Sequence, residues 1–146
     1  MKSGKNLERS NYKSSLCVQR TSAVEAIGFP GEKSLKIVVT YPEAFEEPIP
    51  EKMSDRSSRM LIRKGDEIEY EKLSETLYNI GFERVDFVSL PGQYAIRGSI
   101  VDIFSYSNNH PYRISFWGDE VESIHLFETN TQLSISEEES VNVISN

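Results

Sequence analysis

The chain has 146 residues, of which 38% are hydrophobic and 27% are charged, and its formal net charge is −7. This length suits one domain, or one domain with a piece of a neighbour. No apolar run approaches the roughly 20 residues that a bilayer-spanning helix needs, and the basic N-terminus lacks the apolar segment of a secretory signal. The only cysteine, Cys17, excludes an intrachain disulfide and favours a reducing, cytoplasmic location.

Charge is unevenly distributed along the chain. Residues 1–64 hold 12 Lys and Arg against 8 Asp and Glu, a net of +4, whereas residues 65–146 hold 4 against 15, a net of −11. Because so acidic a second half repels a phosphate backbone, we expect it to bind no nucleic acid directly. The few arginines within it must then have another use.

The first part of the chain, residues 1–58, predicts a partial α/β segment followed by a linker. We expect a short strand at Leu16–Val18 and a helix over Thr21–Ile27, with Thr21 as its cap. Leu35–Tyr41 is dense in β-branched residues and predicts a strand. Prolines among many charges indicate a linker over residues 47–58, so a domain boundary is expected near residue 58.

The second part, residues 59–146, predicts an α+β domain with a small, largely antiparallel sheet packed on one main helix. Arg59–Arg63 predicts its first strand. Glu71–Ile80 predicts the helix, because leucine and isoleucine recur at i, i+4 and i+7 along it. Asp66 is a candidate helix cap, and Gly81 suits a left-handed residue after the last turn. We expect this helix to lie across the sheet.

Residues 81–127 contain four short apolar runs, each closed by a turn signal, and each run predicts a β-strand. Leu90–Gly92 ends the first run, Gly98 and Ser99 interrupt the second, and Ser105–Pro111 separates the second from the third. Gly118 and Asp119 join the third run to the fourth in a predicted two-residue hairpin. Beyond them we expect a polar turn at 128–132, a solvated acidic tail at 137–139 and a last strand at 141–144.

The same stretch carries a family resemblance. Its runs VDFVSLPGQYAIRGSIVDIF and PYRISFWGDEVESIHLF resemble the domain shared by two bacterial repair proteins, the transcription-repair coupling factor and the excinuclease component UvrB. The run Pro91-Gly92-Gln93-Tyr94 is more similar to the coupling factor. The resemblance covers about Gly65 to Val143, and residues 1–58 resemble the end of a preceding, degenerate helicase-like module.

This resemblance implies a non-catalytic module that recruits the excinuclease component UvrA in transcription-coupled nucleotide-excision repair. The parent protein of that family is an ATP-dependent DNA translocase. RNA polymerase and DNA would be contacted only by parts of the parent that this chain lacks.

Three arginines are the candidate partner-binding residues: Arg84, Arg97 and Arg113. The guanidinium fork can pair bidentately with a carboxylate. From the residues alone, these arginines either pair with nearby glutamates on a solvated face or bind carboxylates of a partner. The resemblance implies the second use on one outer strand face, because matching arginines in UvrB belong to the surface that docks UvrA.

Four aromatic residues near these arginines either add apolar contact or form core on one face of the sheet: Tyr94, Phe104, Phe116 and Trp117. Tyr94 and Phe116 are the candidates for contact with the partner. Of the adjacent Phe116 and Trp117, only one can face the helix, and the outward one would flank the site. Asp102 lies in an apolar strand, so its charge needs Arg97 or Arg113 as a partner. The chain departs from UvrB at Ala95 and Ser115, where UvrB has an arginine and an acidic residue.

We expect no cofactor, metal or catalytic group. Only two histidines occur, His110 and His125, without ligand spacing, and neither a P-loop nor a GxSxG motif is present. Two alternatives to recruitment stay open: a helicase fragment that contributes to ATP or DNA handling, and a stand-alone competitor for UvrA.

Overall fold

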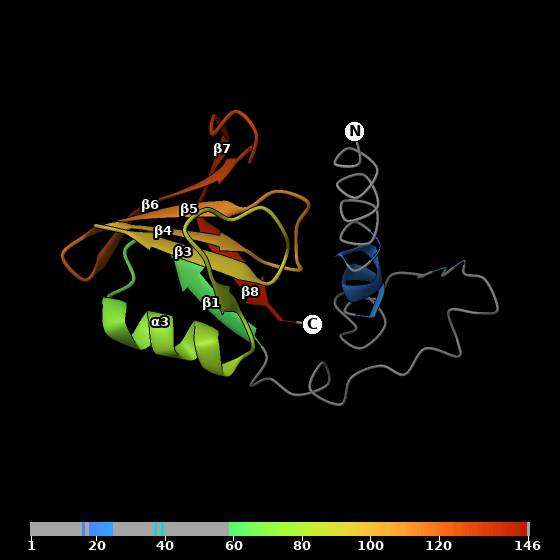
Figure 1. Ribbon diagram of the computed structural model, residues 1–146, viewed down its shortest axis with the longest axis horizontal. Helices are drawn as coiled ribbons and strands as arrows, with labels where there is room; N and C mark the ends of the chain where they lie inside the picture. Colours follow the sequence, from blue (N-terminus) through green and yellow to red (C-terminus); the bar gives the residue numbers. More distant parts are fainter. Residues whose placement is uncertain (1–15, 17, 25–36, 38, 40–58, 146) are drawn as a thin grey trace, which may run out of the picture.

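The structure, a computed structural model, describes residues 16, 18–24, 37, 39 and 59–145 (Figure 1). The named elements run in the order β1 (Arg59–Arg63), α3 (Tyr70–Asn79), β2 (Glu83–Arg84), β3 (Gln93–Arg97), β4 (Ile100–Phe104), β5 (Tyr112–Trp117), β6 (Glu120–Phe127), β7 (Ser134–Glu138) and β8 (Ser140–Ile144). Strands therefore dominate after one main helix, which confirms the predicted α+β class.

Residues 16 and 18–24 are helical, so the predicted strand at Leu16–Val18 is wrong. Thr21 lies inside this helix and does not cap it. Val18 and Thr21, three residues apart, are both buried, which is the spacing of one helix face. The predicted strand at Leu35–Tyr41 lies mostly outside the described residues; the two that are described, Ile37 and Val39, are in no strand. The predicted linker at 47–58 also lies outside them.

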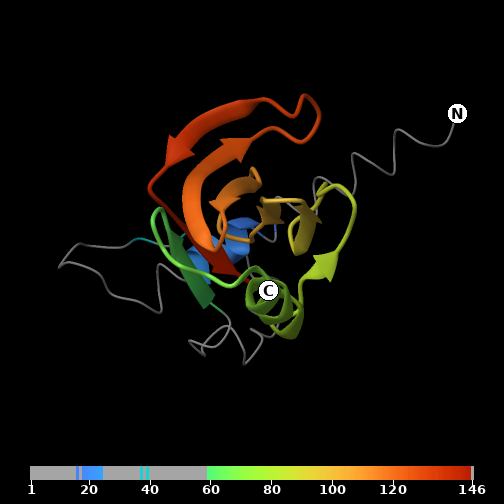
Figure 2. The ribbon, with the colours of Figure 1, turned by 90° about the vertical axis from the view of Figure 1, so that its left-hand side faces the viewer.

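Six strands form one sheet in the order β2-β3-β4-β5-β6-β7, and β1 pairs with β8 in a second, two-stranded sheet. All pairs are antiparallel except β2 with β3, as predicted for a largely antiparallel sheet. The six-stranded sheet curves, with α3 and the β1–β8 pair on its concave side (Figure 2). We call the concave side the inner face and the opposite side the outer face.

The core lies between the inner face and its cover. Alternate residues of β3 to β6 enter it, together with Leu73 and Leu77 of α3 and Ile62 of β1. Because strand side chains alternate between faces, every second position is apolar and buried on this side. The helix therefore lies across the sheet, as its spacing predicted.

The helix ends as predicted, but it does not begin as predicted. Gly81 follows the last turn with φ +94°, a left-handed conformation that glycine adopts without a Cβ penalty. The N-cap is Glu69, with no side-chain capping bond. Asp66 is not the cap: its carboxylate accepts the backbone N–H of Arg63 at 2.7 Å, in the turn after β1.

Two tight turns organise the central strands. The predicted hairpin is confirmed: Trp117 pairs with Glu120 across Gly118 and Asp119, and Gly118 has φ +61°. Gly98 and Ser99 do more than interrupt a run, because they form the two-residue turn between β3 and β4.

Two other predictions are corrected. The first apolar run is a strand only over β2: after Arg84 the chain becomes a loop over residues 85–92 that crosses the outer face, where Val88 is buried. The acidic run at 137–139 is not a tail, because Glu137 and Glu138 belong to β7 and pair with β6. The predicted first and last strands, by contrast, are confirmed as β1 and β8.

Candidate functional site: an arginine-lined sheet edge

The register of the sheet places one polar row across the outer face. Ala95 pairs with Asp102, Asp102 with Arg113, and Arg113 with His125. Directly paired residues share a face, so Asp102 and Arg113 are cross-strand neighbours. Arg97 lies two residues along β3 from Ala95 and reaches Asp102 diagonally.

Asp102 is clamped by two arginines, and we call Arg97, Asp102 and Arg113 the arginine–aspartate cluster. Arg113 donates from Nε to Oδ1 at 2.8 Å and from Nη2 to Oδ2 at 2.9 Å. Arg97 donates from Nη2 to the same Oδ2. Asp102 is only 1% exposed. A buried carboxylate is stable only when it is paired and hydrogen-bonded, and both predicted partners supply this.

Arg113 is engaged on every side in the structure. Its Nη2 also donates to Oε1 of Gln132 at 2.8 Å, and its guanidinium stacks 4.1 Å from the ring centroid of Phe127. The hydrogen bonds to Asp102 raise the pKa of the Arg113 guanidinium above its ordinary value. Gln132, in the polar turn before β7, is a residue that sequence reasoning missed. Arg113 therefore supports the site and has little donor capacity left for another molecule.

Arg97 is only partly engaged. One of its nitrogens binds Asp102, and its side chain is 34% exposed. Its guanidinium also lies 4.8 Å from the ring centroid of Phe87, which is 66% exposed at the outer face. A cation held over an aromatic ring beside water can still donate outward. Phe87 was not singled out by sequence reasoning, although its apolar run was.

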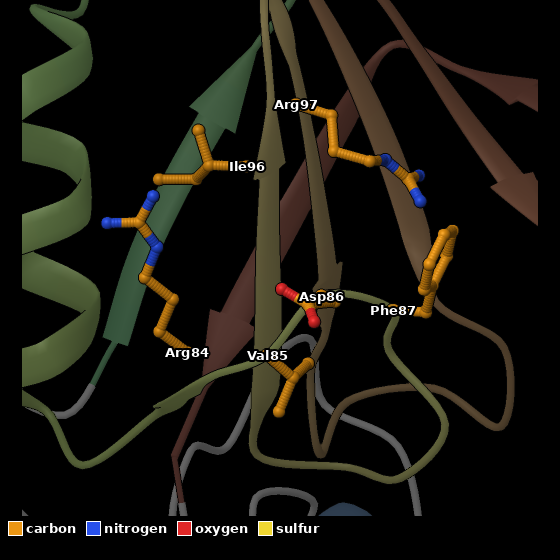
Figure 3. A pocket seen from close by; sticks show the side chains of 6 residues that line it. All are labelled: Arg84, Val85, Asp86, Phe87, Ile96 and Arg97. Carbon is orange, nitrogen blue, oxygen red and sulfur yellow. The ribbon is translucent and has the colours of Figure 1, made fainter.

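Arg84 lies on the other side of the sheet from Arg97. It pairs with Tyr94 across β2 and β3, and Tyr94 faces the inner core. Figure 3 shows Arg84 beside Ile96 on the α3 side of β3, and Arg97 with Phe87 on the opposite side. The expectation of three arginines on one face is therefore wrong. Arg84 is exposed and has no ion-pair partner within the described part of the chain.

Although they lie on opposite faces, Arg84 and Arg97 border the same open depression at the sheet edge. Its volume is ≈ 650 Å³, and its lining residues are Arg84, Val85, Asp86, Phe87, Ile96 and Arg97. Two guanidinium groups against one carboxylate leave the rim net positive, in a domain that is otherwise strongly acidic. Such a rim attracts acidic groups of a partner, whereas the rest of the acidic domain repels them.

The loop that forms one wall of this depression is held in place by the outer face. Val88 packs with Ala95, Phe104 and Phe127 in a second, smaller apolar cluster. The side-chain oxygen of Gln93 accepts the backbone N–H groups of residues 89 and 90, both at 3.0 Å. The loop is therefore anchored, and Phe87 is presented at a defined position.

The predicted aromatic contacts need correction. Tyr94 and Phe116 are buried in the inner core, so neither is available to a partner. Tyr94 also exchanges a hydrogen bond with Ser74 of α3 at 3.3 Å. Trp117 is the outward member of the adjacent pair, at 75% exposed, as alternation requires. Which of the two pointed outward depended on register, which the sequence did not supply.

Residues 18–24 and 59–145 include no group of three or more His, Cys, Asp or Glu side chains placed to hold a metal ion. Among the helices that the structure describes, none has the length and apolar character to cross a membrane.

The fold is that of a small α+β domain with a largely antiparallel sheet, and two arginines border an open depression at one edge of that sheet. A model of the UvrB interaction domain family matches residues 60–146. The chain belongs to this family.

Individual relatives carry names from bacterial DNA repair. The chain is 39% identical over 107 residues to a protein from Bacillus subtilis strain 168 named transcription-repair-coupling factor. These residues make up 73% of the chain and 9% of that protein. It is 40% identical over 81 residues to the UvrABC system protein B of Ureaplasma parvum serovar 3, covering 55% of the chain and 12% of that protein. The chain thus spans about a tenth of the length of these relatives.

Proposed function

We propose that residues 59–146 form a non-catalytic domain that binds UvrA and recruits it in transcription-coupled nucleotide-excision repair in the cytoplasm. Membership of the UvrB interaction domain family supports a protein partner. The single observation that carries the proposal is the positive rim formed by Arg84 and Arg97 on an acidic domain. RNA polymerase and DNA would be handled by other parts of a longer, coupling-factor-like protein.

The two outward arginines and Arg113 have different roles in this proposal. Arg84 and Arg97 contact carboxylates of UvrA, with Phe87 adding apolar area beside Arg97. Arg113 holds Asp102, and Asp102 in turn fixes the Arg97 side chain. Preorganised guanidinium groups lose less conformational entropy on binding than free ones. The domain therefore offers few contacts, and one of them, Arg97, is held in a fixed geometry.

The test is a titration of the chain into purified UvrA by calorimetry. We expect the double variant Arg84→Glu, Arg97→Glu to weaken binding by at least about a hundredfold, since loss of a buried interfacial charge pair costs about 2–5 kcal/mol. Lys64→Glu is the matched control, because it reverses one charge beside β7 at the opposite edge of the sheet. It should leave the affinity within about threefold of the parent.

Thermal melts separate loss of binding from loss of fold. Because Arg84 is exposed, its reversal leaves the core intact, whereas Arg97→Glu also places a second carboxylate beside Asp102. The single variant Arg84→Glu must therefore show a clear loss of affinity with an unchanged melting temperature. Unchanged binding by the double variant would show that UvrA docks elsewhere.

A further inference from the structure

The edge of β3 that faces away from β4 is paired with another strand over only part of its length. β2 pairs with β3 at two positions, Glu83 with Gln93 and Arg84 with Tyr94, and its last bond runs from the N–H of Val85 to the carbonyl of Tyr94. The chain then leaves the sheet for the loop over the outer face. No other strand of the described residues lies beside β3 past this point.

This edge leaves backbone hydrogen-bonding groups facing outward. The carbonyls of Gly92 and Tyr94 accept the N–H groups of Glu83 and Val85, so these two carbonyls point toward the edge. Backbone groups two residues apart in a strand point the same way. Ile96 therefore directs its N–H and its carbonyl away from β4, into the open depression that its own side chain helps to line. An exposed edge of this kind is a template for another strand.

The two arginines beside Ile96 lie where they could bind successive side chains of an added strand. Arg84 lies on the inner side of the edge and Arg97 on the outer side (Figure 3). Successive side chains of an extended chain point to opposite faces, whereas those of a helix do not alternate in this way. A strand laid along this edge would thus send one side chain toward Arg84 and the next toward Arg97.

We propose that UvrA docks by adding an extended acidic segment to this edge, with its backbone paired to the N–H and carbonyl of Ile96. Two consecutive carboxylates of that segment reach Arg84 and Arg97, one on each side of the sheet. Phe87 covers the outer side chain, and Asp86 excludes a third acidic residue from the floor of the depression. Main-chain bonds supply affinity in such strand addition, and the flanking side chains supply specificity.

Strand addition rests on the proposed function and adds to it the binding mode and the chemistry of the partner segment. Hydrogen exchange of the chain with and without UvrA, read at single-residue resolution, tests it directly. The Ile96 amide should exchange at least about tenfold more slowly in the complex, because an amide in a ladder exchanges only when the ladder opens. The Ala95 amide, which points toward β4, should change little and serves as the internal control.

A second measurement isolates the backbone bond from the side chain. Ile96→Pro removes the edge N–H but keeps the ladder to β4, since proline is tolerated where the N–H faces away from the sheet. Ile96→Ala keeps the N–H and removes the side chain. We expect the proline variant to bind UvrA about tenfold more weakly than the alanine variant, the effect of one or two lost hydrogen bonds.

The outcomes separate the two proposals. Binding of UvrA with an unprotected Ile96 amide overturns strand addition and leaves the recruitment role standing. Equal affinities for Ile96→Pro and Ile96→Ala, with both variants folded by circular dichroism, overturn it as well. No binding of UvrA to the parent chain overturns both proposals together.

Discussion

The two faces of the six-stranded sheet are built from the same strands but are stabilised differently. The inner face is continuous and apolar, and α3 and the β1–β8 pair cover it. The outer face has one small apolar cluster under the loop, and beside it the arginine–aspartate cluster. Burial of apolar area is non-directional, whereas a clamped carboxylate requires defined geometry. The inner face therefore provides most of the stability, and the outer face provides oriented charges.

The largest expected effect falls on the inner face. Leu77→Ala removes a fully buried side chain from the contact between α3 and the sheet. It should lower the free energy of unfolding by about 3 kcal/mol, through lost transfer energy and the cavity left behind. Denaturant unfolding measures this. Tyr78→Ala, next to it but exposed, should change stability by less than about 0.5 kcal/mol; equal losses would mean that α3 packs differently.

A smaller loss of stability is expected on the outer face, with a larger effect on binding. Asp102→Ala leaves two guanidinium groups without their shared carboxylate and should cost about 2 kcal/mol, less than a wholly buried pair because both arginines are partly exposed. It should also weaken UvrA binding, although Asp102 is too buried to touch a partner. Asp102→Asn keeps the shape of the side chain. Its stability and its affinity for UvrA should lie between those of the parent and those of Asp102→Ala. Unchanged affinity for Asp102→Ala at full folding would mean that Arg97 is not oriented by it.

The smallest effect belongs to the exposed pair that joins the turn after β1 to β7. Lys64 donates to Glu137 at 2.7 Å; this hydrogen bond lowers the pKa of Glu137 below its ordinary 4.5 and raises that of Lys64 above 10.5. A carboxyl group whose pKa is lowered by folding stabilises the fold at any pH above its pKa in the unfolded chain. This contribution disappears as the pH falls through its pKa in the folded protein. The lysine, whose pKa is raised by folding, stabilises the fold below its pKa in the unfolded chain. This contribution is lost as the pH rises through its pKa in the folded protein.

The pair therefore contributes between these limits, from about pH 5 to about pH 10. Glu137→Gln should lower the melting temperature slightly at about pH 7, since exposed pairs contribute little, and by less at about pH 3, where the carboxyl group gains protons. Thermal melts of both proteins at the two pH values test this. A difference that is as large at about pH 3 as at about pH 7 would show that Glu137 acts through something other than its charge.

Local signals in the sequence predicted much of the fold. β1, β8, the hairpin at Gly118 and the end of α3 at Gly81 follow from β-propensity and from glycine at positive φ, which depend on a few neighbouring residues. The apolar run after Arg84 misled because Val88 is apolar for a different reason: it fills the outer cluster as part of a loop. The acidic strand β7 was not predicted, because its pairing with β6 overrides the low β-propensity of its residues.

The candidate site was only partly predictable. Asp102 in an apolar strand required a cationic partner, and the structure supplies Arg97 and Arg113. Phe87 and Gln132 carried no distinguishing signal, since one resembles a strand residue and the other a turn residue. Tyr94 and Phe116 were misplaced because alternation assigns two faces to a strand without saying which is covered.

By itself, the sequence determined the class of fold, the acidic character of the domain, the turns and the need to pair Asp102, because each follows from local conformation or from the cost of a buried charge. Tertiary structure alone decided that Arg84 and Arg97 lie on opposite sides of one open edge and that Arg113 is fully engaged. Those facts depend on strand register and on where β2 ends, and both are set by contacts between residues far apart in the chain.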